Sequence, residues 1–318
     1  MQDAWLVAAV CTNRAPGAVD ATLHALGRQV KDLSGAAGLL VTSGAGDERH
    51  AELDALAREQ GFGVERVPAA GAAAARNRAV ESVADEAVIA FIDDDAIPAP
   101  EWLARLAAHW REAPPDVACI GGAILPRWLK PPPRWMSPRL DVVFSLMDRG
   151  EGVKELVPGV EDAWSVNASF RAGPLHEVGG FDPTLGPRGD VPLFAEDTEV
   201  QLRLANAGYR GLYAGDVRVE HLIGAERMRL REVFRRRFYA GASMRMTGQW
   251  SIPDGIARLL AGAGETAAAF LARRHPALAE GIARTGAGAG VLAAPLVRRR
   301  SETAGPARSG ANGRGNGR

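Results

Sequence analysis

The sequence predicts an α/β fold in which a mainly parallel central sheet is covered by helices on both faces. Short apolar runs alternate with helix-like stretches through the first 125 residues and recur about 25–30 residues apart, which is the pattern of βαβ units. These runs are continuously apolar rather than alternating, as strands buried on both faces usually are. Of the 318 residues, 47% are hydrophobic and 24% are charged, so the chain can bury a sizeable core.

The elements of the first 125 residues follow one another in this pattern. We expect strands at 5–11, 38–42, 64–67 and 87–92, and helices at 18–30, 48–60 and 72–84. The Pro- and Trp-rich segment 126–138 should be neither helix nor central strand, because proline lacks a backbone donor. This segment is either a surface connector or a lid over a binding site, because Trp128, Arg134 and Trp135 lie close together on a rigid backbone.

Helices dominate the C-terminal part of the expected fold. One begins at Glu196 and ends near Ala207 before Gly208, a strongly basic one covers 229–246, and one or two Ala-rich helices cover 255–284 with a break near 275–276. Residues 301–318 lack core-forming side chains and should be disordered. We therefore divide the chain into a main domain with two halves, a helical segment and a basic tail, with the bounds 1–125, 126–250, 251–300 and 301–318.

Composition restricts the compartment and the partners. The 38 basic and 38 acidic residues balance, which gives no reason to expect nucleic-acid binding. Cys11 and Cys119 are the only cysteines, too few for a disulfide framework or a cysteine-based zinc site. With no signal peptide or membrane-spanning run at its N-terminus or beyond, the chain is expected to be soluble and cytoplasmic. From Arg298 onward the net charge is +5, so the tail could contact anionic lipid at the inner membrane face; a solvated tail is the alternative.

Three consecutive aspartates follow the strand predicted at 87–92. Asp93, Asp94 and Asp95 should lie at the carboxyl edge of the sheet, where open α/β sheets bind ligands. Strand alternation puts Asp93 and Asp95 on one side and Asp94 on the other. Two carboxylates that face one point repel each other unless a cation lies between them. The pattern therefore indicates either a metal site or a solvated acidic turn.

Two further segments carry candidate residues, each with an ordinary structural alternative. Glu196 and Asp197 open a predicted helix, where the positive end of the helix dipole favours carboxylates, so either residue could simply cap the helix. His221 ends a predicted strand and Arg227 follows six residues later. Taken alone, a histidine at a strand end is usually structural.

Read together and in order, these segments resemble the family 2 glycosyltransferases of the GT-A fold, a Rossmann-like sandwich. The resemblance covers residues 5–241, and no single motif decides it. Its motifs are TNR (12–14), GAAAARNRA (71–79), IDDD (92–95), VNASFRA (166–172), VGGFDPTLG (178–186), AEDTE (195–199), AGYRGLYAGDVRVEH (207–221) and YAG (239–241).

The resemblance implies an inverting transfer of a sugar from a nucleotide-diphosphate sugar to an acceptor hydroxyl. Asp93 and Asp95 match the metal-binding DxD motif, and His221 matches a position that often joins the metal, here Mn²⁺ or Mg²⁺. Arg227 could clamp the diphosphate. Asp197 matches the catalytic base that takes the proton of the attacking hydroxyl. The acceptor would be a glycan, a lipid-linked glycan, a protein or a small natural product.

The remaining expected substrate contacts come from the same motifs. Arg76 and Asn77 should contact the nucleotide or diphosphate, unless they only face solvent from a helix that packs on the sheet. Residues 1–125 would form the donor half and 126–250 the acceptor half. The other residues assigned to substrate binding are Thr12, Asn13, Arg14, Ser43, Asp93, Asp94, Trp164, Asn167, Glu196 and Arg227.

The sequence departs from the family pattern in two places, which bear on the identity of the nucleotide and on whether the enzyme is processive. Relatives often place an aspartate after the second strand to recognise the base, whereas this chain has Thr42 and Ser43, so the nucleotide stays open. The QxxRW motif of processive synthases is absent and RRRFY at 235–239 only faintly resembles it. A single transfer is therefore favoured over polymerisation.

Three other functions remain open from the residues themselves. A glycoside hydrolase would need two acids that flank a sugar, and three clustered aspartates fit a cation better. A nucleotidyltransferase would favour a Gly-rich phosphate loop with a lysine, and none of Lys31, Lys130 and Lys154 lies in such a loop. A catalytically silent nucleotide-sugar binder would not need Asp197, although its presence does not exclude one.

Overall fold

The computed structural model describes residues 4–44, 47–68, 71–188 and 191–303. Its strands are β1 (Leu6–Thr12), β2 (Ala36–Ser43), β3 (Phe62–Val67), β4 (Val88–Asp93), β5 (Ala96–Pro98), β6 (Val117–Trp128), β7 (Val153–Glu155), β8 (Asn167–Arg171), β9 (Pro187–Arg188), β10 (Val191–Pro192) and β11 (Arg210–Ile223). Its helices are α1 (Pro16–Asp32), α2 (Asp47–Glu59), α3 (Ala72–Glu81), α4 (Trp102–Glu112), the 3₁₀ helix η1 (Pro138–Phe144), α5 (Ala172–Glu177), α6 (Glu196–Asn206), α7 (Leu230–Met246), α8 (Ile252–Leu271) and α9 (His275–Thr303).

The central sheet confirms the predicted α/β fold. Its strand order is β3-β2-β1-β4-β8-β6-β11-β5, with β7 also paired to β11. β1, β2, β3, β4, β6 and β11 run in one direction, and β5, β7 and β8 oppose them. The first strand shows why the sequence folds this way, since six consecutive apolar residues of β1 lie between two parallel neighbours and are buried or nearly so.

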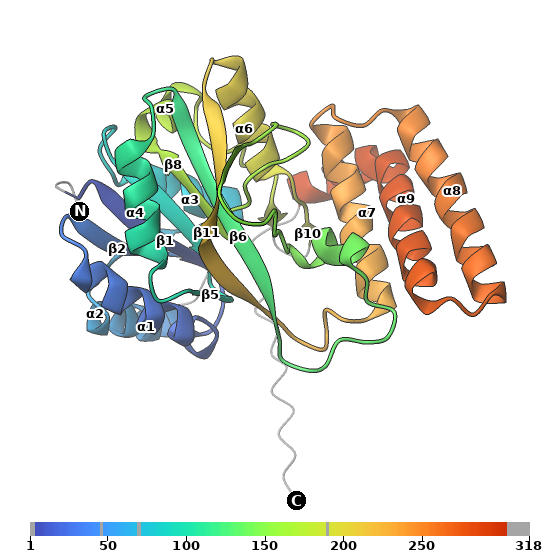
Figure 1. The fold of residues 1–318 in the computed structure, drawn as a ribbon, viewed down its shortest axis with the longest axis horizontal. Coiled ribbons are helices and arrows are strands. Elements are labelled where there is room, and N and C mark those ends of the chain that lie inside the picture. The colour runs from blue at the N-terminus through green and yellow to red at the C-terminus, as the bar shows by residue number, and fades with distance from the viewer. Residues whose placement is uncertain (1–3, 45–46, 69–70, 189–190, 304–318) are drawn as a thin grey trace, which may run out of the picture.

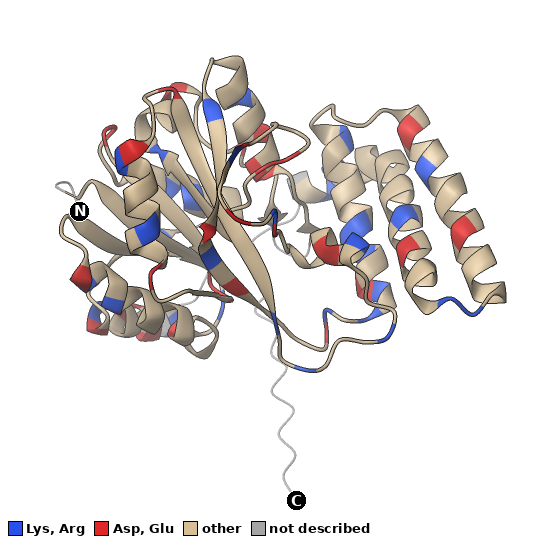
Figure 2. Ribbon diagram, viewed as in Figure 1, with Lys and Arg blue, Asp and Glu red and all other residues tan. Residues whose placement is uncertain are grey.

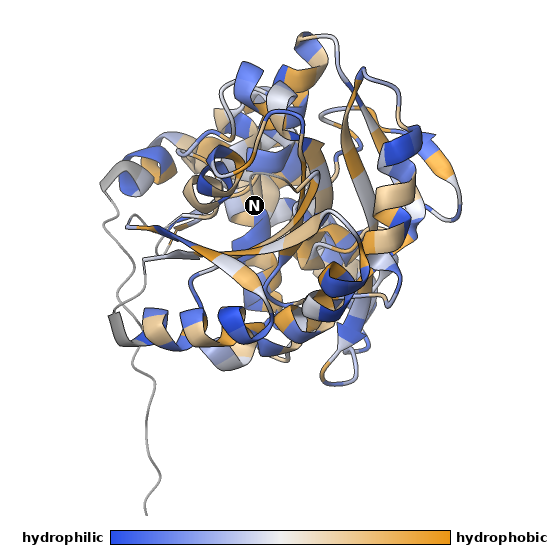
Figure 3. Ribbon diagram, turned by 90° about the vertical axis from the view of Figure 1, so that its left-hand side faces the viewer, coloured by the Kyte–Doolittle hydropathy of each residue, from blue (hydrophilic) through white to orange (hydrophobic). Residues whose placement is uncertain are grey.

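Helices cover both faces of this sheet. α1 contacts α2 and α4 on one face, while α5 contacts α3 and α6 on the other. Figure 1 shows α4 in front of the strands, with α1 and α2 below them at the lower left. Figure 3 shows hydrophobic colour along the strands and mixed colours on the helices, as expected for helices with one face on the sheet. Phe91, Phe170 and Phe181 pack edge-on or tilted beneath this second layer, with ring centroids 5.7–6.3 Å apart.

The last three helices form a separate layer beside the sheet (Figure 1). α9 lies against both α7 and α8, and glycines allow the helix backbones to approach closely. A Cβ at Gly241 of α7 would lie 2.0 Å from the carbonyl oxygen of Ala287, and one at Gly290 of α9 would lie 1.8 Å from that of Phe238. Any larger side chain at either position would force these helices apart.

The structure corrects two expectations about element ends. Residues 126–128 continue β6 along β11, although the Pro-rich segment was expected to contain no central strand. Pro126 is tolerated because β8 pairs with β6 only at residues 119–121, so the missing donor can face a side with no strand. α9 continues to Thr303, three residues into the expected tail, and residues 304–318 lie outside the described part. None of the described helices is long and apolar enough to cross a membrane.

Candidate active site

A cavity of about 360 Å³ lies at the carboxyl edge of the sheet, a size suited to a small-molecule ligand. β1 and β4 are parallel neighbours, with Cys11 opposite Asp93, so both strands end at this edge. Cavity walls also come from the starts of α3 and α6, from η1, from the end of β11 and from α7. The segments that carry the predicted motifs therefore meet around one cavity.

Asp94 is held against β1. Its carboxylate accepts a hydrogen bond of 2.5 Å from Thr12 Oγ1 and lies 3.6 Å from the Arg14 guanidinium. Burial raises the pKa of Asp94 to about 7, although Arg14 opposes this shift. These contacts engage Asp94 with the end of β1. Because β4 ends at Asp93, Asp94 and Asp95 lie in the turn that follows the strand.

Asp95 lies within a group of cationic and imidazole nitrogens. His221 Nε2 is 3.2 Å, an Arg14 nitrogen 3.0 Å and an Arg227 nitrogen 3.8 Å from its carboxylate. Burial alone would raise the pKa of Asp95, but His221 and the two guanidinium groups hold it well below its usual range. We therefore expect Asp95 to remain a charged carboxylate at every physiological pH.

The tautomer of His221 follows from its second nitrogen. Nδ1 lies 2.9 Å from the carbonyl oxygen of Phe144, which can only accept a hydrogen bond, so Nδ1 carries the proton and donates it. In the neutral ring, Nε2 is then an acceptor beside Asp95, and Arg227 donates to it over 3.0 Å. Histidines that ligate metals commonly donate their other ring N–H to a carbonyl in this way.

Arg76 of α3 links the acids of β4 and α6. Its guanidinium lies 2.7 Å from Glu196, 3.7 Å from Asp93 and 4.0 Å from Asp197, and its side chain is only 8% exposed. Burial raises the pKa of Glu196 to about 7, helped by the charge of Asp197 and opposed by Arg76. Burial also raises the pKa of Asp93, which Arg76 opposes. Arg76 therefore partly neutralises three acids that would otherwise repel one another.

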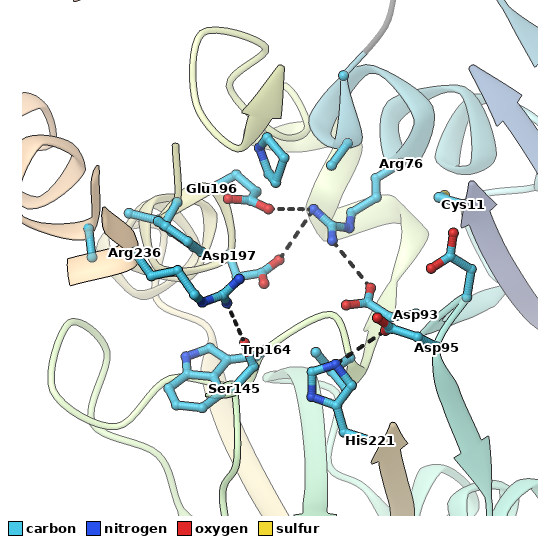
Figure 4. Close-up of a pocket in the computed structure, with 18 of the residues that line it drawn as sticks. Cys11, Arg76, Asp93, Asp95, Ser145, Trp164, Glu196, Asp197, His221 and Arg236 are labelled. Carbon is cyan, nitrogen blue, oxygen red and sulfur yellow. Dashed lines mark hydrogen bonds and ion pairs between the residues drawn. The ribbon is translucent and has the colours of Figure 1, made fainter. Parts of the chain in front are cut away.

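Asp197 is oriented by a residue that the sequence reading missed. Ser165 donates its backbone N–H to Asp197 Oδ2 over 2.9 Å and its hydroxyl to Oδ1. Asp197 lies in the first turn of α6, and the preceding Ala195 adopts a left-handed conformation with φ 74°. Figure 4 shows the Asp197 carboxylate between Arg76 and Arg236 at the cavity. No motif marks Ser165, because its role depends on a contact 32 residues away.

Two predicted substrate contacts are structural instead. Asn77 does not line the cavity; its amide donates to the carbonyl oxygen of Phe181 and accepts from the Phe181 N–H. Asn167 is buried, donates to the carbonyl oxygens of Ala123 and Val217, and accepts from Trp102 Nε1. Both amides satisfy buried backbone groups, so neither is available to a ligand.

We expect Asn77→Ala to destabilise the fold and leave nucleotide binding unchanged. The substitution leaves the N–H and carbonyl of Phe181 without their partner, which typically costs about 1–3 kcal/mol. A lower urea midpoint with an unchanged affinity for a nucleoside diphosphate would agree with this structural role. A stable variant with weakened nucleotide binding would contradict it.

The other predicted contacts line the cavity, together with several residues that were not predicted. Trp164 faces the cavity beside Ser145 and His221 (Figure 4). The predicted lining residues are Thr12, Asn13, Arg14, Ser43, Arg76, Asp93, Asp94, Asp95, Trp164, Glu196, Asp197, His221 and Arg227. Those not predicted include Cys11, Val142, Ser145, Phe194, Arg236, Arg237 and Met244. The basic RRRFY segment was the available signal for the two arginines.

A divalent cation fits the donors at this edge. Asp93 and Asp95 bring their carboxylates close together near His221 (Figure 4), and His221 Nε2 lies 3.2 Å from the Asp95 carboxylate. In the described ranges, no three His, Cys, Asp or Glu side chains form a ready-made metal centre. Carboxylate donors suit Mn²⁺ and Mg²⁺, and cations at phosphate sites commonly take their other ligands from phosphates and water.

The sequence of this chain is similar to those of known glycosyltransferases. Residues 7–179 match the model of the family described as Glycosyl transferase family 2. A glucosyl-dolichyl phosphate glucuronosyltransferase of Haloferax volcanii is 31% identical over 160 residues, 50% of each chain. A pre-mycofactocin glycosyltransferase of Mycobacterium tuberculosis is 28% identical over 197 residues, 61% of this chain and 38% of that protein. The chain thus spans half or less of the length of these curated relatives.

Solved structures show the same fold at low identity. The mannosyltransferase PcManGT from Pyrobaculum calidifontis, in complex with GDP-Man and Mn²⁺, has a TM-score of 0.62 and 17% identity, with 92% of this chain and 87% of that one covered. Residues 1–349 of TarS from S. aureus give a TM-score of 0.50 and 12% identity, covering 93% and 92%. The predicted GT-A fold is confirmed. With more than half of its length matched by the family model, the chain belongs to glycosyl transferase family 2.

Proposed function

We propose that this chain moves one sugar from a nucleotide-diphosphate sugar to an acceptor hydroxyl, with inversion at the anomeric carbon. The observation that carries the proposal is Asp197, which Ser165 holds at the same cavity as Asp93, Asp95 and His221. A base and a diphosphate-binding edge on one cavity are what a direct displacement needs. The names of the curated relatives, both glycosyltransferases, support the same reaction class.

The donor would bind with its diphosphate at the β1 and β4 ends. Arg14 and Arg227 flank Asp95 there and can turn their free N–H groups toward phosphate oxygens. Asn13 and Ser43 line the adjoining wall and can contact the nucleoside. Asp93, Asp95 and His221 would hold Mn²⁺ or Mg²⁺, which supplies Lewis-acid stabilisation of the departing diphosphate.

The reaction step uses groups of this chain. The acceptor oxygen attacks the anomeric carbon from the side opposite the diphosphate, and Asp197 takes the hydroxyl proton. The bond from the anomeric carbon to the diphosphate oxygen breaks, and the diphosphate leaves with the electron pair. The two Ser165 hydrogen bonds fix the orientation of the Asp197 carboxylate, and the proton moves late because a carboxylate is a weak base.

Slow donor hydrolysis distinguishes this function from the alternatives. We expect UDP- or GDP-sugars to release free sugar when Mn²⁺ or Mg²⁺ is present and not when EDTA is added. A silent binder would show only thermal stabilisation by the nucleotide. Release of pyrophosphate from a nucleoside triphosphate and a sugar phosphate would indicate a nucleotidyltransferase. Against that alternative, no lysine lines the cavity in the described ranges.

Peripheral contact with an anionic membrane is the second part of this proposal, and the α8–α9 turn supports it. Phe270 and Leu271 are 72% and 83% exposed at the end of α8, and the exposed Arg273 and Arg274 follow after Ala272. Figure 2 shows this turn in the colour of Lys and Arg. Large apolar side chains beside cations are suited to the interface of anionic lipids. The name of the Haloferax volcanii relative also includes a dolichyl phosphate lipid.

We expect the protein to sediment with vesicles that contain phosphatidylserine and not with pure phosphatidylcholine vesicles. The double variant Phe270→Ser, Leu271→Ser should lose most of this sedimentation, since two apolar anchors are removed from the surface. Removal of residues 304–318 tests the contribution of the tail separately. Equal sedimentation of the wild type with both kinds of vesicle would contradict the contact.

A further inference from the structure

The α7 side of the cavity contains cationic side chains without acidic partners. Arg14, Arg76 and Arg227 each lie within 4.0 Å of a carboxylate. Arg236 instead donates to the carbonyl oxygen of Val143 over 2.6 Å and approaches the Ser145 hydroxyl at 3.4 Å. Both Arg236 partners are uncharged, so its positive charge is not balanced by an ion pair within the described chain.

Arg237 has still fewer partners. It lines the cavity, yet its guanidinium makes no hydrogen bond, ion pair or ring contact with any residue that the structure describes. Burial and the neighbouring Arg258 lower the pKa of Arg237 to about 10, and burial and Arg227 lower that of Arg236 to about 9. The side chain is partly exposed at the cavity, and an anionic ligand bound there would supply the counter-charge that no described residue provides.

The position of this pair separates it from the donor diphosphate. In Figure 4, Arg236 reaches the cavity from the side opposite Asp93 and Asp95, with Asp197 between them. Arg237 is on α7 next to Arg236, and Arg258 of α8 is the charged neighbour that affects it. The proposed function assigns the Asp93 and Asp95 edge to the donor diphosphate. The two arginines lie beyond Asp197 from that edge, which is the acceptor side of the cavity.

Apolar side chains line the cavity wall beside the two arginines. Ala240 and Met244 follow Arg237 on the same face of α7, at i+3 and i+7. Val142 of η1 and Phe194 before α6 complete this wall, and the Arg236 guanidinium lies 5.1 Å from the Phe194 ring centroid. A ligand bound here would meet two cations and a hydrophobic surface together.

We propose that Arg237, with Arg236, binds an anionic group on the acceptor, a phosphate or a carboxylate attached to an apolar body. This inference rests on the proposed function, because it takes the donor to occupy the Asp93 and Asp95 edge. It names the acceptor class as an amphiphilic anion. The group bound by the arginines would fix the acceptor so that its hydroxyl faces Asp197.

Three matched probes distinguish the chemistry of this group. Citronellyl phosphate, citronellic acid and citronellol share one apolar body and differ in carrying a phosphate, a carboxylate or a neutral hydroxyl. Calorimetry would measure each with the full chain in the presence of Mn²⁺ and saturating UDP or GDP. We expect one of the two anions to bind at least about tenfold more tightly than the alcohol, since a charge-assisted hydrogen bond gives about that factor or more.

The variants then assign the binding to α7. Arg237→Gln should lower the affinity for the preferred anion about 10–100-fold and leave that for citronellol unchanged. Arg235→Gln is the matched control, because Arg235 loses the same charge from the same helix, pairs with Glu232 and does not line the cavity. Its affinity for all three probes should stay within about twofold. Equal binding of the anions and the alcohol by the wild type would overturn the proposal.

Donor binding separates failure of this inference from failure of the proposed function. UDP or GDP with Mn²⁺ should bind Arg237→Gln as tightly as wild type. If Arg237→Gln loses nucleotide and anion affinity equally, the arginine belongs to the diphosphate and the acceptor site is wrong. If it loses affinity only for UDP-glucuronate and not for UDP-glucose, the anion belongs to the transferred sugar, and the acceptor assignment is again wrong. Absence of nucleotide binding by the wild type would contradict the proposed function itself.

Discussion

Replacing Asp197 by asparagine is expected to lower the rate of sugar transfer about 10²–10⁴-fold, the usual contribution of a positioned general base. Asparagine keeps the size and shape of aspartate, and its amide oxygen can still accept from Ser165, but it cannot take a proton. Donor affinity should survive nearly intact, because the proposed diphosphate site at Asp93 and Asp95 keeps its side chains. Measuring donor affinity by calorimetry and transfer rate at saturating donor separates the two effects.

Glu196→Gln is the control for this experiment, and the structure changes its interpretation. The position on α6 predicted that Glu196 points elsewhere, about 100° round the helix from Asp197. Glu196 in fact bonds to Arg76 over 2.7 Å and also lines the cavity. We still expect a smaller loss of rate than for Asp197→Asn, together with a loss of stability, because Arg76 loses one charged partner. If Asp197→Asn transferred sugar at the wild-type rate and Glu196→Gln were inactive, the catalytic base would be Glu196 and not Asp197.

The parts of the site that the sequence predicted come from local patterns. An apolar strand followed at once by Asp93, Asp94 and Asp95 predicts that these acids lie at the carboxyl edge of the sheet, whereas their alternation was not predictable, because the strand ends at Asp93. The start of α6 could also be predicted, because acids cluster in its first turn before a periodic apolar face. In both cases the position of the residue depends on its own element and on few others.

The parts that the sequence did not predict depend on distant contacts. Arg76 and Glu196 are 120 residues apart, and Asn77 and Phe181 are 104 apart. Nothing local distinguishes an amide that binds a ligand from one that satisfies a backbone group, so Asn77 was assigned to the wrong role. Arg237 was missed for the same reason, since only the packed fold shows that it has no acidic partner in the described residues.

The second large effect is expected when Asp95, the proposed cation ligand whose charge is best maintained, is replaced by asparagine. Asp95 is the acid whose pKa is held low, by His221, Arg14 and Arg227 against the effect of burial, so its negative charge is available at neutral pH. Asp95→Asn removes that charge from the proposed ligand set and keeps the side-chain volume. Losing a residue that only supports a metal ligand typically costs 10–100-fold, and we expect the loss of a ligand to cost at least that much in cation-dependent affinity for UDP or GDP.

Asp94→Asn is the matched control, because it changes the same atoms one residue earlier in the turn that follows β4. Asp94 accepts from Thr12 Oγ1, and its pKa of about 7 means that it is partly protonated at neutral pH, so the neutral amide replaces a group that already carries less charge. Its cation-dependent affinity should stay within a few-fold of wild type. Calorimetry with Mn²⁺ and with EDTA isolates the cation-dependent part for each variant. If Asp95→Asn binds nucleotide with the same dependence on Mn²⁺ as the wild type, the cation is not held by Asp95.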